Sequence, residues 1–309
     1  MFIGAIDGGG TKVLTAVMTE TGEMLAKRQA SVPTADHAAY FARCAGMLAE
    51  CASEVNVSLD ELAGVGVSLP AMTDGQDRVL GSPSAGWGAF SVRPLLVPAL
   101  GMCSDRVFIE NDVNACALAE MRFAKGGANF IWMTVSTGIG GAVVANGHLV
   151  RGAGFCAGEI GHIKVEFEKP RRCGCGGCGC LEAHASGTAI GRLAREAGLD
   201  ADAKQCEALA SQGDPAALEV FAQAGLYIGR ALAMTANVLN PERVYIGGGV
   251  AHALSLLLPS LRLEFDRGAL PQCRSVMIEP TRLGYEAALF GAAAVCLDGL
   301  TGRAECKLD

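Results

Sequence analysis

Residues 130–150 read FIWMTVSTGIGGAVVANGHLV, and they repeat the plan of residues 3–25, IGAIDGGGTKVLTAVMTETGEML. In both stretches an apolar strand enters a glycine-rich polar turn, and a second apolar strand follows. A short turn at Gly22 or at Gly147 then leads into a third strand. An internal repeat of this length predicts two similar lobes, each offering a glycine loop to a shared cleft. The alternative is that any β-hairpin next to a glycine loop produces the same pattern.

Strand and helix patterns alternate along the rest of the chain, which predicts an α/β fold. A chain of 309 residues is long enough for two domains, and no low-complexity linker separates them. Asp214-Pro215 is typical of a helix start, because aspartate caps the helix and proline suits its first turn. The predicted elements are strands over 2–7, 12–20, 23–32, 63–69, 105–111 and 244–250, and helices over 36–56, 113–125, 215–240 and 284–297.

Composition limits the classes of partner. The net charge of −7 argues against nucleic acid as the main partner, because phosphate neutralisation requires clustered Lys and Arg. The thirteen cysteines are an odd number, no signal peptide precedes the first strand, and no apolar run spans a membrane with clean flanks. Residues such as Cys44, Cys51, Cys116 and Cys296 lie among apolar neighbours, as small core residues do. We therefore expect a soluble, reduced, cytoplasmic protein.

The stretch 158–182, GEIGHIKVEFEKPRRCGCGGCGCLE, combines a histidine, four cysteines and two glutamates that flank them. Thiolates packed so closely are typical of a site for a soft or borderline metal, and zinc suits a Cys/His set best. The residues alone leave two ligand sets open: the four cysteines, or His162 with three of them. Because Glu159 and Glu182 are not needed by a structural zinc knot, they indicate that the metal shapes a polar pocket.

Three glycine-rich turns follow apolar strands, at residues 7–12, 136–141 and 247–249. Consecutive backbone N–H groups in such a turn form an anion-binding nest, and a carboxylate such as Asp7 suits Mg²⁺. The first turn, DGGGTK, fits neither the P-loop nor the dinucleotide-binding pattern, since both lead into a helix. The third turn suits a flat group such as a nucleotide base. A plain tight hairpin explains one such turn, but three in one chain are harder to explain in that way.

Asn111 and Asp112 follow a buried apolar strand and precede a helix. The plain interpretation is a helix N-cap, where Asn and Asp are favoured for local hydrogen bonding. A carboxylate at the end of a strand is also where a general base for phosphoryl transfer is expected.

These motifs resemble those of the ROK family (repressors, open reading frames and kinases), which belongs to the actin-like ATPases. The resemblance covers nearly the whole chain, through IDGGGTK at 6–12, ENDVNACALAE at 110–120 and VSTGIGGAVVANGHLVRGAGFCAGEIGH at 135–162. His162, ten intervening residues and the segment CGCGGCGCLE at 173–182 match the zinc signature of the family. The last motif is long and highly specific.

The resemblance implies a two-lobed actin-like ATPase fold, related to ribonuclease H, with duplicated domains around a central cleft. The first lobe is expected over residues 1–112, completed by the C-terminal helix 284–309. The second is expected over residues 113–283, with a zinc-binding loop at 162–180. The implied activity is ATP-dependent phosphorylation of a sugar, and the implied assembly is a homodimer.

The resemblance also implies residues for each role. Asp112 is expected to act as general base toward a sugar hydroxyl. The sugar is expected to be bound by Asn111, Glu159, His162 and Glu182. Structural Zn²⁺ is expected at His162, Cys173, Cys175 and Cys180, which leaves Cys178 as the spare thiol. ATP is expected at Gly8, Gly9, Gly10, Thr11, Lys12, Thr137, Gly138, Gly247, Gly248 and Gly249, and its Mg²⁺ at Asp7.

Two positions depart from the family pattern. Ala71 stands where the family commonly has glycine, and Ser84 stands where many members have asparagine. The shorter serine side chain implies a lost or water-mediated sugar contact, or a roomier pocket. Trp87, nearby, is explained equally well by packing within the lobe.

The substrate and the activity have alternatives. Glucose is the sugar that the resemblance favours, but fructose, mannose and the N-acetylhexosamines (N-acetylglucosamine and N-acetylmannosamine) stay open. A sugar-binding sensor without catalysis would have the same zinc and sugar contacts, although Asp112 and both phosphate loops favour a kinase. The repressors of the family carry a helix-turn-helix segment ahead of the first strand, whereas this sequence starts at that strand.

Overall fold

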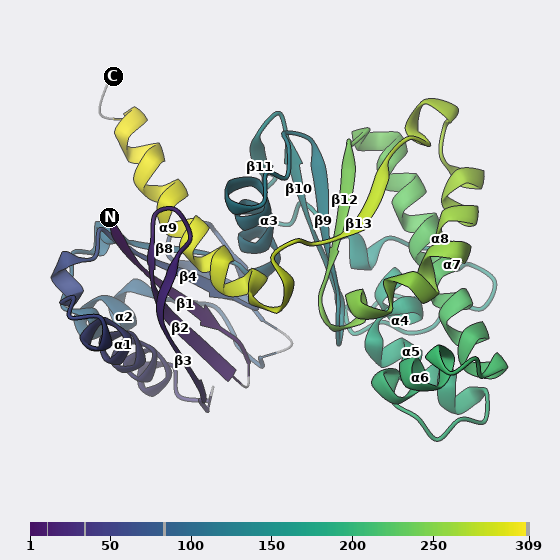
Figure 1. Ribbon diagram of the computed structural model, residues 1–309, viewed down its shortest axis with the longest axis horizontal. Coiled ribbons are helices and arrows are strands. Elements are labelled where there is room, and N and C mark those ends of the chain that lie inside the picture. Colours follow the sequence, from purple (N-terminus) through teal and green to yellow (C-terminus); the bar gives the residue numbers. More distant parts are fainter. Residues whose placement is uncertain (11, 34, 83–84, 307–309) are drawn as a thin grey trace. The chain divides into compact units, whose positions relative to one another are not determined.

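The computed structural model describes residues 1–10, 12–33, 35–82 and 85–306, and the chain divides into two compact units (Figure 1). Unit 1 contains Met1–Gly126, Arg151–Cys156 and the chain from Arg282 onward, and unit 2 contains Gly127–Val150 and Ala157–Thr281. The sequence predicted that the second lobe begins at residue 113. The structure differs, because the helix Asp112–Phe123 packs against the C-terminal helix within unit 1.

Unit 1 is built on a five-stranded sheet in the order β3-β2-β1-β4-β8. The first three strands form an antiparallel meander, whereas β4 and β8 run parallel to β1. The strands are β1 (Phe2–Gly8), β2 (Lys12–Thr19), β3 (Met24–Ser31), β4 (Val65–Leu69) and β8 (Val107–Asn111). Because β1 and β8 are parallel, Asp7 and Asn111 lie at the same edge of this sheet.

Unit 2 repeats this topology in a second five-stranded sheet, in the order β11-β10-β9-β12-β13. Its strands are β9 (Phe130–Val135), β10 (Ile139–Ala145), β11 (His148–Val150), β12 (Arg243–Gly247) and β13 (Met277–Pro280). The corresponding hairpin turns have Gly22 at φ 90° and Gly147 at φ 77°, a left-handed backbone that favours glycine. The equal order and directions of the strands confirm the internal repeat and the α/β class.

Helices cover both faces of the sheet of unit 1. On one face, α1 (His37–Glu54) packs against apolar side chains such as Ile6 and Val67, beside the short helix α2 (Arg93–Leu100). On the other face, α9 (Ala287–Cys306) packs against Ile3 and Ala5, with α3 (Asp112–Phe123) alongside it. The strand β4 and the helix α9 approach each other closely, because a Cβ on Gly66 would lie only 1.8 Å from the backbone oxygen of Ala292.

Unit 2 has its core between its sheet and a pair of long helices, α7 (Pro215–Leu239) and α8 (Leu254–Gly268). As the sequence predicted, Asp214 caps α7, and its carboxylate accepts a hydrogen bond from the N–H of Ala217 at 2.9 Å. Gly225 and Gly229 allow the two helices to approach, since a Cβ at either position would lie 2.4 Å from a carbonyl oxygen of α8. Shorter helices precede α7, namely α4 (Leu181–Ala185), α5 (Gly187–Glu196) and α6 (Ala203–Ser211).

The order of elements repeats along the chain as well. The first repeat is β1-β2-β3-α1-β4-α2-β8-α3, and the second is β9-β10-β11-α7-β12-α8-β13-α9. The first carries an insertion of three short strands, β5 (Met72–Thr73), β6 (Arg78–Gly81) and β7 (Phe90–Ser91). The second carries the cysteine-rich loop with α4, α5 and α6. The last helix of the second repeat, α9, nevertheless packs in unit 1.

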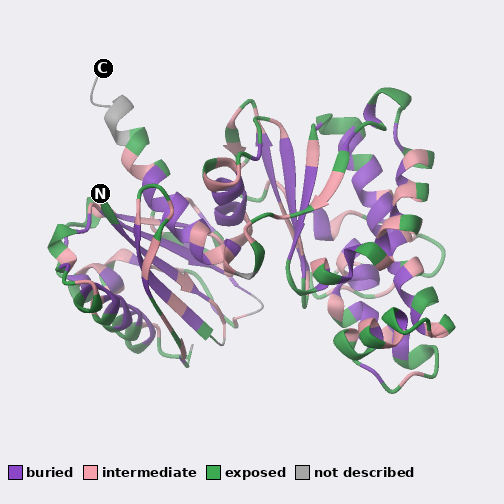
Figure 2. Ribbon diagram, in the orientation of Figure 1, coloured by how far each residue is buried: buried purple, intermediate pink, exposed green. Residues whose placement is uncertain are grey.

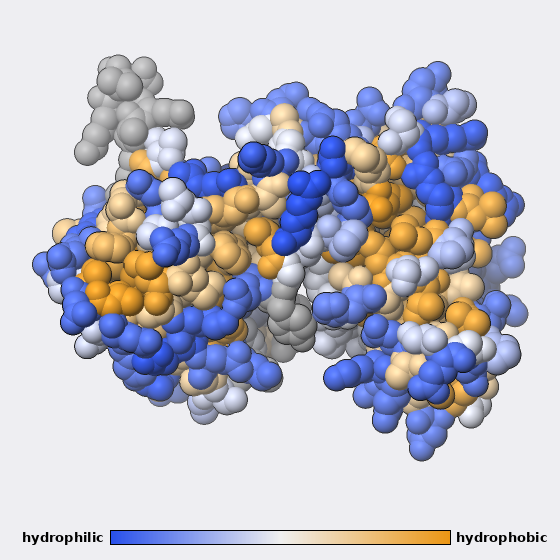
Figure 3. Space-filling view, in the orientation of Figure 1, coloured by the Kyte–Doolittle hydropathy of each residue, from blue (hydrophilic) through white to orange (hydrophobic). Residues whose placement is uncertain are grey.

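The distribution of buried residues follows the sheets and the inner faces of their helices (Figure 2). The four cysteines predicted to be core residues are all buried: Cys44, Cys51, Cys116 and Cys296. Some large apolar side chains remain exposed, among them Val238 of α7 and Leu263 of α8, and apolar areas are visible on the surface in Figure 3. No helix among the described residues is both long and apolar enough to cross a membrane.

Candidate active site and metal centre

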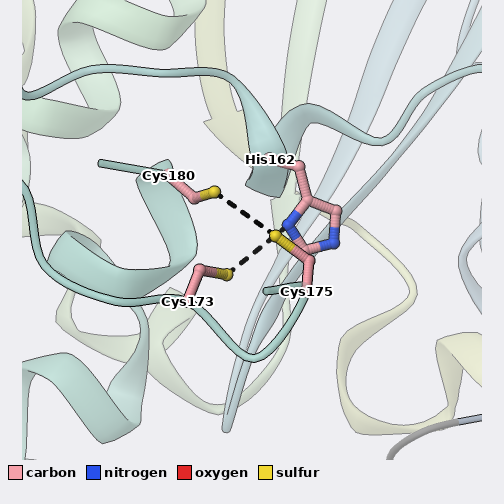
Figure 4. Close-up of side chains that lie close together, drawn as sticks. All are labelled: His162, Cys173, Cys175 and Cys180. Atoms are coloured by element: carbon pink, nitrogen blue, oxygen red, sulfur yellow. Dashed lines mark hydrogen bonds between the residues drawn. The ribbon is translucent and has the colours of Figure 1, made fainter. Parts of the chain in front are cut away.

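Within the described part of the chain, one group of side chains has the composition and spacing of a metal centre. The ligand atoms of His162, Cys173, Cys175 and Cys180 all lie within 4.8 Å of one another (Figure 4). His162 Nδ1 is 3.7 Å from Cys173 Sγ, and the Sγ atoms of Cys175 and Cys180 are 3.6 Å apart. Three thiolates and one imidazole fit tetrahedral zinc, so this donor set suits the predicted metal.

The sequence left two ligand sets open, and the structure brings His162, rather than Cys178, to the other three cysteines. His162 ends a 3₁₀ turn, Ile160–His162, that leads its ring to the cysteines, and Cys180 precedes the first residue of α4. Cys178 is exposed and lies outside the cluster, paired through its backbone with Arg172. The fourth position beside the three cysteines is therefore occupied by histidine.

A network that the sequence analysis missed holds the cysteine-rich loop against the helices of unit 2. Glu166 accepts hydrogen bonds from the hydroxyl of Tyr227 at 2.9 Å and from the N–H of Lys169 at 3.1 Å. These donors, the backbone of Lys169 first, lower the pKa of Glu166 to about 2. Buried His184 accepts from the N–H of Arg171 at 3.2 Å, and burial lowers its pKa. Glu166, Tyr227 and His184 had no recognisable motif around them in the sequence.

Glu182 connects the metal loop with the second glycine loop. Its Oε2 accepts a hydrogen bond from the N–H of Ile139 at 3.0 Å, and its Oε1 lies 3.7 Å from Cys173 Sγ. A Cβ at position 138 would lie 2.4 Å from Glu182 Oε2, so any larger residue there would force the Glu182 carboxylate to move. Glu182 thus brings the predicted phosphate loop into contact with the predicted metal loop.

Glu159 lies on the opposite side of the histidine ring. Its Oε2 is 3.8 Å from His162 Nε2, so the two ring nitrogens face different partners, Nδ1 toward the cysteines and Nε2 toward Glu159. The Glu159 side chain is 45% exposed. Partial burial raises the pKa of its carboxyl, the neighbouring His162 lowers it, and Glu182 raises it again.

Two predicted nucleotide loops of unit 2 lie against the end of β9. The carbonyl oxygen of Thr137 accepts a 2.8 Å hydrogen bond from the hydroxyl of Thr188, at the start of α5. Gly248, at φ 85°, is packed so that a Cβ would lie 2.6 Å from the carbonyl oxygen of Val135. This left-handed glycine ends the strand at Gly247, three residues before the predicted end of 244–250.

The first glycine loop follows β1 in unit 1. The Tyr40 hydroxyl donates a hydrogen bond to the carbonyl oxygen of Gly9 at 3.1 Å, and a Cβ on Gly8 would lie 2.8 Å from that hydroxyl. The loop continues through Gly10 to Lys12, which begins β2 and is exposed, while Thr11 lies outside the described residues.

Asp7 is the carboxylate of this loop. It accepts a 3.4 Å hydrogen bond from the hydroxyl of Ser68 on β4. Burial raises the pKa of Asp7 to about 7, the charge of Asp112 also raises it, and the Ser68 hydrogen bond lowers it. Two carboxylates of unit 1 therefore interact at one edge of its sheet.

Asn111 and Asp112 stand at the junction of β8 and α3. Asn111 is the N-cap, and its Oδ1 accepts hydrogen bonds from the N–H groups of Val113 and Asn114 at 2.9 and 3.1 Å. Asp112 is the first residue of the helix, and its Oδ1 accepts from the Asn111 side-chain amide at 3.1 Å and from the N–H of Val113 at 2.9 Å. Asn111 is thus a helix N-cap, as the plain interpretation predicted, and its side-chain amide also orients the Asp112 carboxylate.

Ala71, one of the two positions that depart from the family pattern, lies at this junction in unit 1. The carbonyl oxygen of Ala71 accepts a hydrogen bond from the Asn111 side chain at 3.2 Å. Trp87 is 5% exposed and makes edge-to-face contacts with Tyr40 and Phe90, so it packs within the unit. Ser84 lies outside the described residues.

The predicted residues thus form two sets. In unit 1 the structure gathers Asp7, the first glycine loop, Asn111 and Asp112 at one sheet edge. In unit 2 it gathers the second glycine loop, Glu159, Glu182 and the metal cluster, and the third glycine loop lies against the same strand β9.

Sequence comparisons assign this arrangement to a family. The sequence profile of the ROK family matches residues 3–298, nearly the whole chain. The glucokinase of Halalkalibacterium halodurans is 34% identical over 286 residues, which cover 86% of this chain and 86% of that protein. An N-acetyl-D-glucosamine kinase of Salmonella heidelberg is 28% identical over 303 residues, which cover 93% of this chain and 96% of that protein.

Solved structures of this family have similar folds. A ROK family glucokinase from Streptomyces griseus, in complex with glucose and AMPPNP, gives a TM-score of 0.82 at 27% identity and covers 96% of this chain and 100% of its own. The ROK hexokinase of Thermus thermophilus gives 0.81 at 32% identity, with coverage of 98% and 100%. A ROK family transcriptional regulator gives 0.86 at 27% identity, with coverage of 97% and 78%. The chain therefore belongs to the ROK family.

Proposed function

We propose that this protein is an ATP-dependent sugar kinase that transfers the γ-phosphate of ATP to a hydroxyl group of glucose. The observation that carries the proposal is the 34% identity to a glucokinase over 86% of this chain. We also propose that the protein acts in the cytoplasm as a homodimer.

Asp112 is the general base in this proposal. It accepts the proton of the sugar hydroxyl as that oxygen attacks the γ-phosphorus, and the bond to the β-phosphate oxygen breaks to release ADP. The hydrogen bonds from the N–H of Val113 and the amide of Asn111 support this role, because they fix the orientation of the carboxylate. Asn111 also binds the sugar.

The glycine loops bind the nucleotide. The N–H groups of residues 8–12 and of Thr137 and Gly138 bind the phosphates, and the loop 247–249 lies beside adenine. Asp7 would hold Mg²⁺, because carboxylate oxygens suit this ion, and Mg²⁺ would neutralise charge on the phosphates. The anchored carbonyls of Gly9 and Thr137 support this assignment, because a loop fixed on one side can direct its N–H groups to the other.

The sugar is bound in unit 2 by Glu159, His162 and Glu182, whose oxygens and ring nitrogen pair with hydroxyl groups. Zinc held by His162, Cys173, Cys175 and Cys180 would have a structural role and would fix the loop that carries these groups. The contact of His162 with the cysteines through Nδ1 supports both of its roles, since Nε2 remains directed toward Glu159.

An N-acetylhexosamine is the second candidate substrate. The N-acetyl-D-glucosamine kinase that matches 93% of this chain favours it, as does Ser84, whose side chain is shorter than the asparagine of the family pattern. A sugar-responsive protein without kinase activity is the third candidate, because a ROK family transcriptional regulator has a similar fold.

The test is ADP release from Mg-ATP with glucose, fructose, mannose, N-acetylglucosamine and N-acetylmannosamine, each measured for the native protein and for Asp112→Asn. Turnover on glucose well above the other sugars, abolished in the variant, supports the proposal. Preference for an N-acetylhexosamine supports the second candidate. If the folded, zinc-loaded protein turns over none of these sugars, the kinase proposal is wrong for them, and sugar binding measured by calorimetry then decides for or against a sensor.

A further inference from the structure

Glu110 is a buried carboxylate that the sequence analysis did not single out. It is 2% exposed, at the end of β8, and both of its oxygens have partners. Its Oε1 accepts hydrogen bonds from the N–H of Asn111 at 3.0 Å and from the side-chain amide of Asn114 at 3.1 Å. Its Oε2 accepts from Arg151 Nε at 2.8 Å. A buried charge is tolerated when it is paired and hydrogen-bonded in this way.

Arg151 reaches Glu110 from a separate part of the chain. It is the first residue of Arg151–Cys156, the short segment that belongs to unit 1 although the chain on either side of it belongs to unit 2. Its guanidinium lies between Glu110, Asp298 of α9, and Gly75 in the β5–β6 turn, where an added Cβ would lie 3.4 Å from Nε. The ion pair therefore holds this segment against the end of β8 within unit 1, and the β5–β6 turn lies beside it.

The contacts of Glu110 bracket Asp112. Asn111 precedes Asp112 and Asn114 follows it by two residues, and Glu110 holds both of them. In register, Glu110 also pairs with Ser68 on β4, which pairs with Asp7 on β1, so three polar residues form one row across the sheet edge. Glu110 and Arg151 are not ligands in the proposed function, but they are bonded to the residues that orient its base.

We propose that Glu110 and Arg151 form a positioning pair that holds the β8–α3 junction, and thereby Asp112, in the geometry needed for proton transfer. The inference rests on the proposed kinase function for its kinetic consequence. Its structural content is that the first turn of α3 depends on this ion pair.

The experiment is a double-mutant cycle of Glu110→Gln and Asp112→Asn, with kcat and the KM of sugar and ATP measured for each protein. Glutamine keeps the shape of the side chain but cannot accept from Arg151 and Asn111 at once, so the junction loosens. We expect kcat to fall by ~10–10²-fold, since a displacement of about 1 Å at a reacting group can have such an effect. In protein that already carries Asp112→Asn, we expect less than a twofold further loss, because the base that Glu110 positions is absent. If the two substitutions lower kcat by independent factors that multiply in the double variant, the proposal is wrong.

A matched control is available in unit 2. Arg230 Nε and Glu264 Oε1 form an ion pair with the same 2.8 Å distance, between α7 and α8, where the carboxylate is 14% exposed. Glu264 pairs with Arg230 and Arg267, neither of which is a proposed ligand, so we expect Glu264→Gln to change kcat by less than twofold in either background. An equal loss of kcat in this control would assign the effect to general destabilisation and would overturn the positioning role.

Hydrogen exchange tests the same inference without activity. In Glu110→Gln and in Arg151→Lys, the amides of Val113 and Asn114 should exchange at least ~10-fold faster than in the native protein, while those of α7 stay unchanged. If the native protein turns over no sugar, the proposed function fails, and the exchange rates still decide the inference. Unchanged exchange at α3 in both variants would contradict it.

Discussion

The two sheets have the same strand order and directions, but their loop edges carry different chemistry. The edge of unit 1 carries Asp7, Glu110 and Asp112, of which Asp7 and Asp112 are close enough to shift a pKa. The β9–β10 loop of unit 2 has no carboxylate of its own, and Glu182 reaches it from the inserted cysteine-rich segment. The repeated backbone supplies glycine loops twice, whereas its charged groups differ. The carboxylates of unit 1 lie on the repeated elements β1, β8 and α3, and Glu182 of unit 2 lies on an inserted segment. The chemistry of a site is thus added to a fold rather than implied by it.

The two glycine loops are also anchored in different ways. In unit 1 a tyrosine from α1 donates its hydroxyl to the Gly9 carbonyl, and in unit 2 a threonine from α5 donates its hydroxyl to the Thr137 carbonyl. One requirement, a fixed carbonyl in the loop, is met by unrelated side chains from elements that do not correspond in the repeat. The following predictions test how the proposed catalytic and binding roles are divided between the two units.

The largest effect is expected from Asp112→Asn in unit 1. The amide keeps the size of the side chain but cannot accept the proton, so kcat should fall by ~10²–10⁴-fold while sugar affinity stays within a few fold. Steady-state kinetics and calorimetry measure the two quantities. Thr137→Ala in unit 2 is the comparison, and a loss of kcat as large as that of Asp112→Asn would contradict the assignment of the base to unit 1.

The next effect is expected in unit 2, from Cys175→Ser. Loss of a thiolate ligand should weaken zinc binding by at least ~10²-fold, since changes even beyond the direct ligands cost about 10–100-fold. Competition with a chromogenic chelator measures the affinity. Cys178→Ser is the matched control two glycines away, and it should bind zinc as the native protein does. If Cys178→Ser loses the metal and Cys175→Ser keeps it, the ligand set is wrong.

Asp7→Asn should remove a pH dependence that belongs to unit 1. Because burial raises the folded-state pKa of Asp7 to about 7, from 3.8, the folded protein binds a proton that the unfolded chain has released between these values. Stability in the absence of nucleotide and metal should therefore fall as pH rises from about 4 to about 7, by up to ~10-fold in the unfolding equilibrium per pH unit.

Chemical denaturation at pH 5, 6, 7 and 8 measures this dependence, which should be absent above about pH 7 and weaker throughout in Asp7→Asn. The difference between the two proteins isolates Asp7 from other titrating groups. Parallel curves for the native protein and the variant would show that Asp7 titrates normally.

The smallest effects are expected from the two loop anchors. Tyr40→Phe and Thr188→Val each remove one hydroxyl and keep most of the packing, so each should cost about 0.5–1.5 kcal/mol of stability. The KM for ATP should rise a few fold in both, because each variant frees a carbonyl of a phosphate loop. Denaturation measures the stability of both variants, and kinetics measures their KM for ATP. An increase in the KM for ATP in one variant alone would mean that only one of the loops contacts the nucleotide.

Local features of the fold were predictable because they depend on neighbouring residues. Apolar runs separated by glycine-rich turns predicted both meanders, and glycine at positions 22 and 147 predicted the second turn of each, where the φ values favour glycine. The Asp214-Pro215 start of α7 followed from capping chemistry. The end of the strand at 243–247 did not, because the left-handed backbone at Gly248 depends on packing against β9.

The sequence by itself determined the α/β class, the internal repeat, the glycine turns and the family signature, since each is written in short-range spacing and composition. Only the tertiary structure decided that α3 and α9 pack together in unit 1, that His162 rather than Cys178 joins the three cysteines, and that Glu110 is paired with Arg151. The contacts of α3 with α9 and of Glu110 with Arg151 join residues far apart in the chain, 41 positions in the last case. The sequence does not show which residue neutralises a given charged side chain, because that partner depends on which distant segment the folded backbone brings beside it.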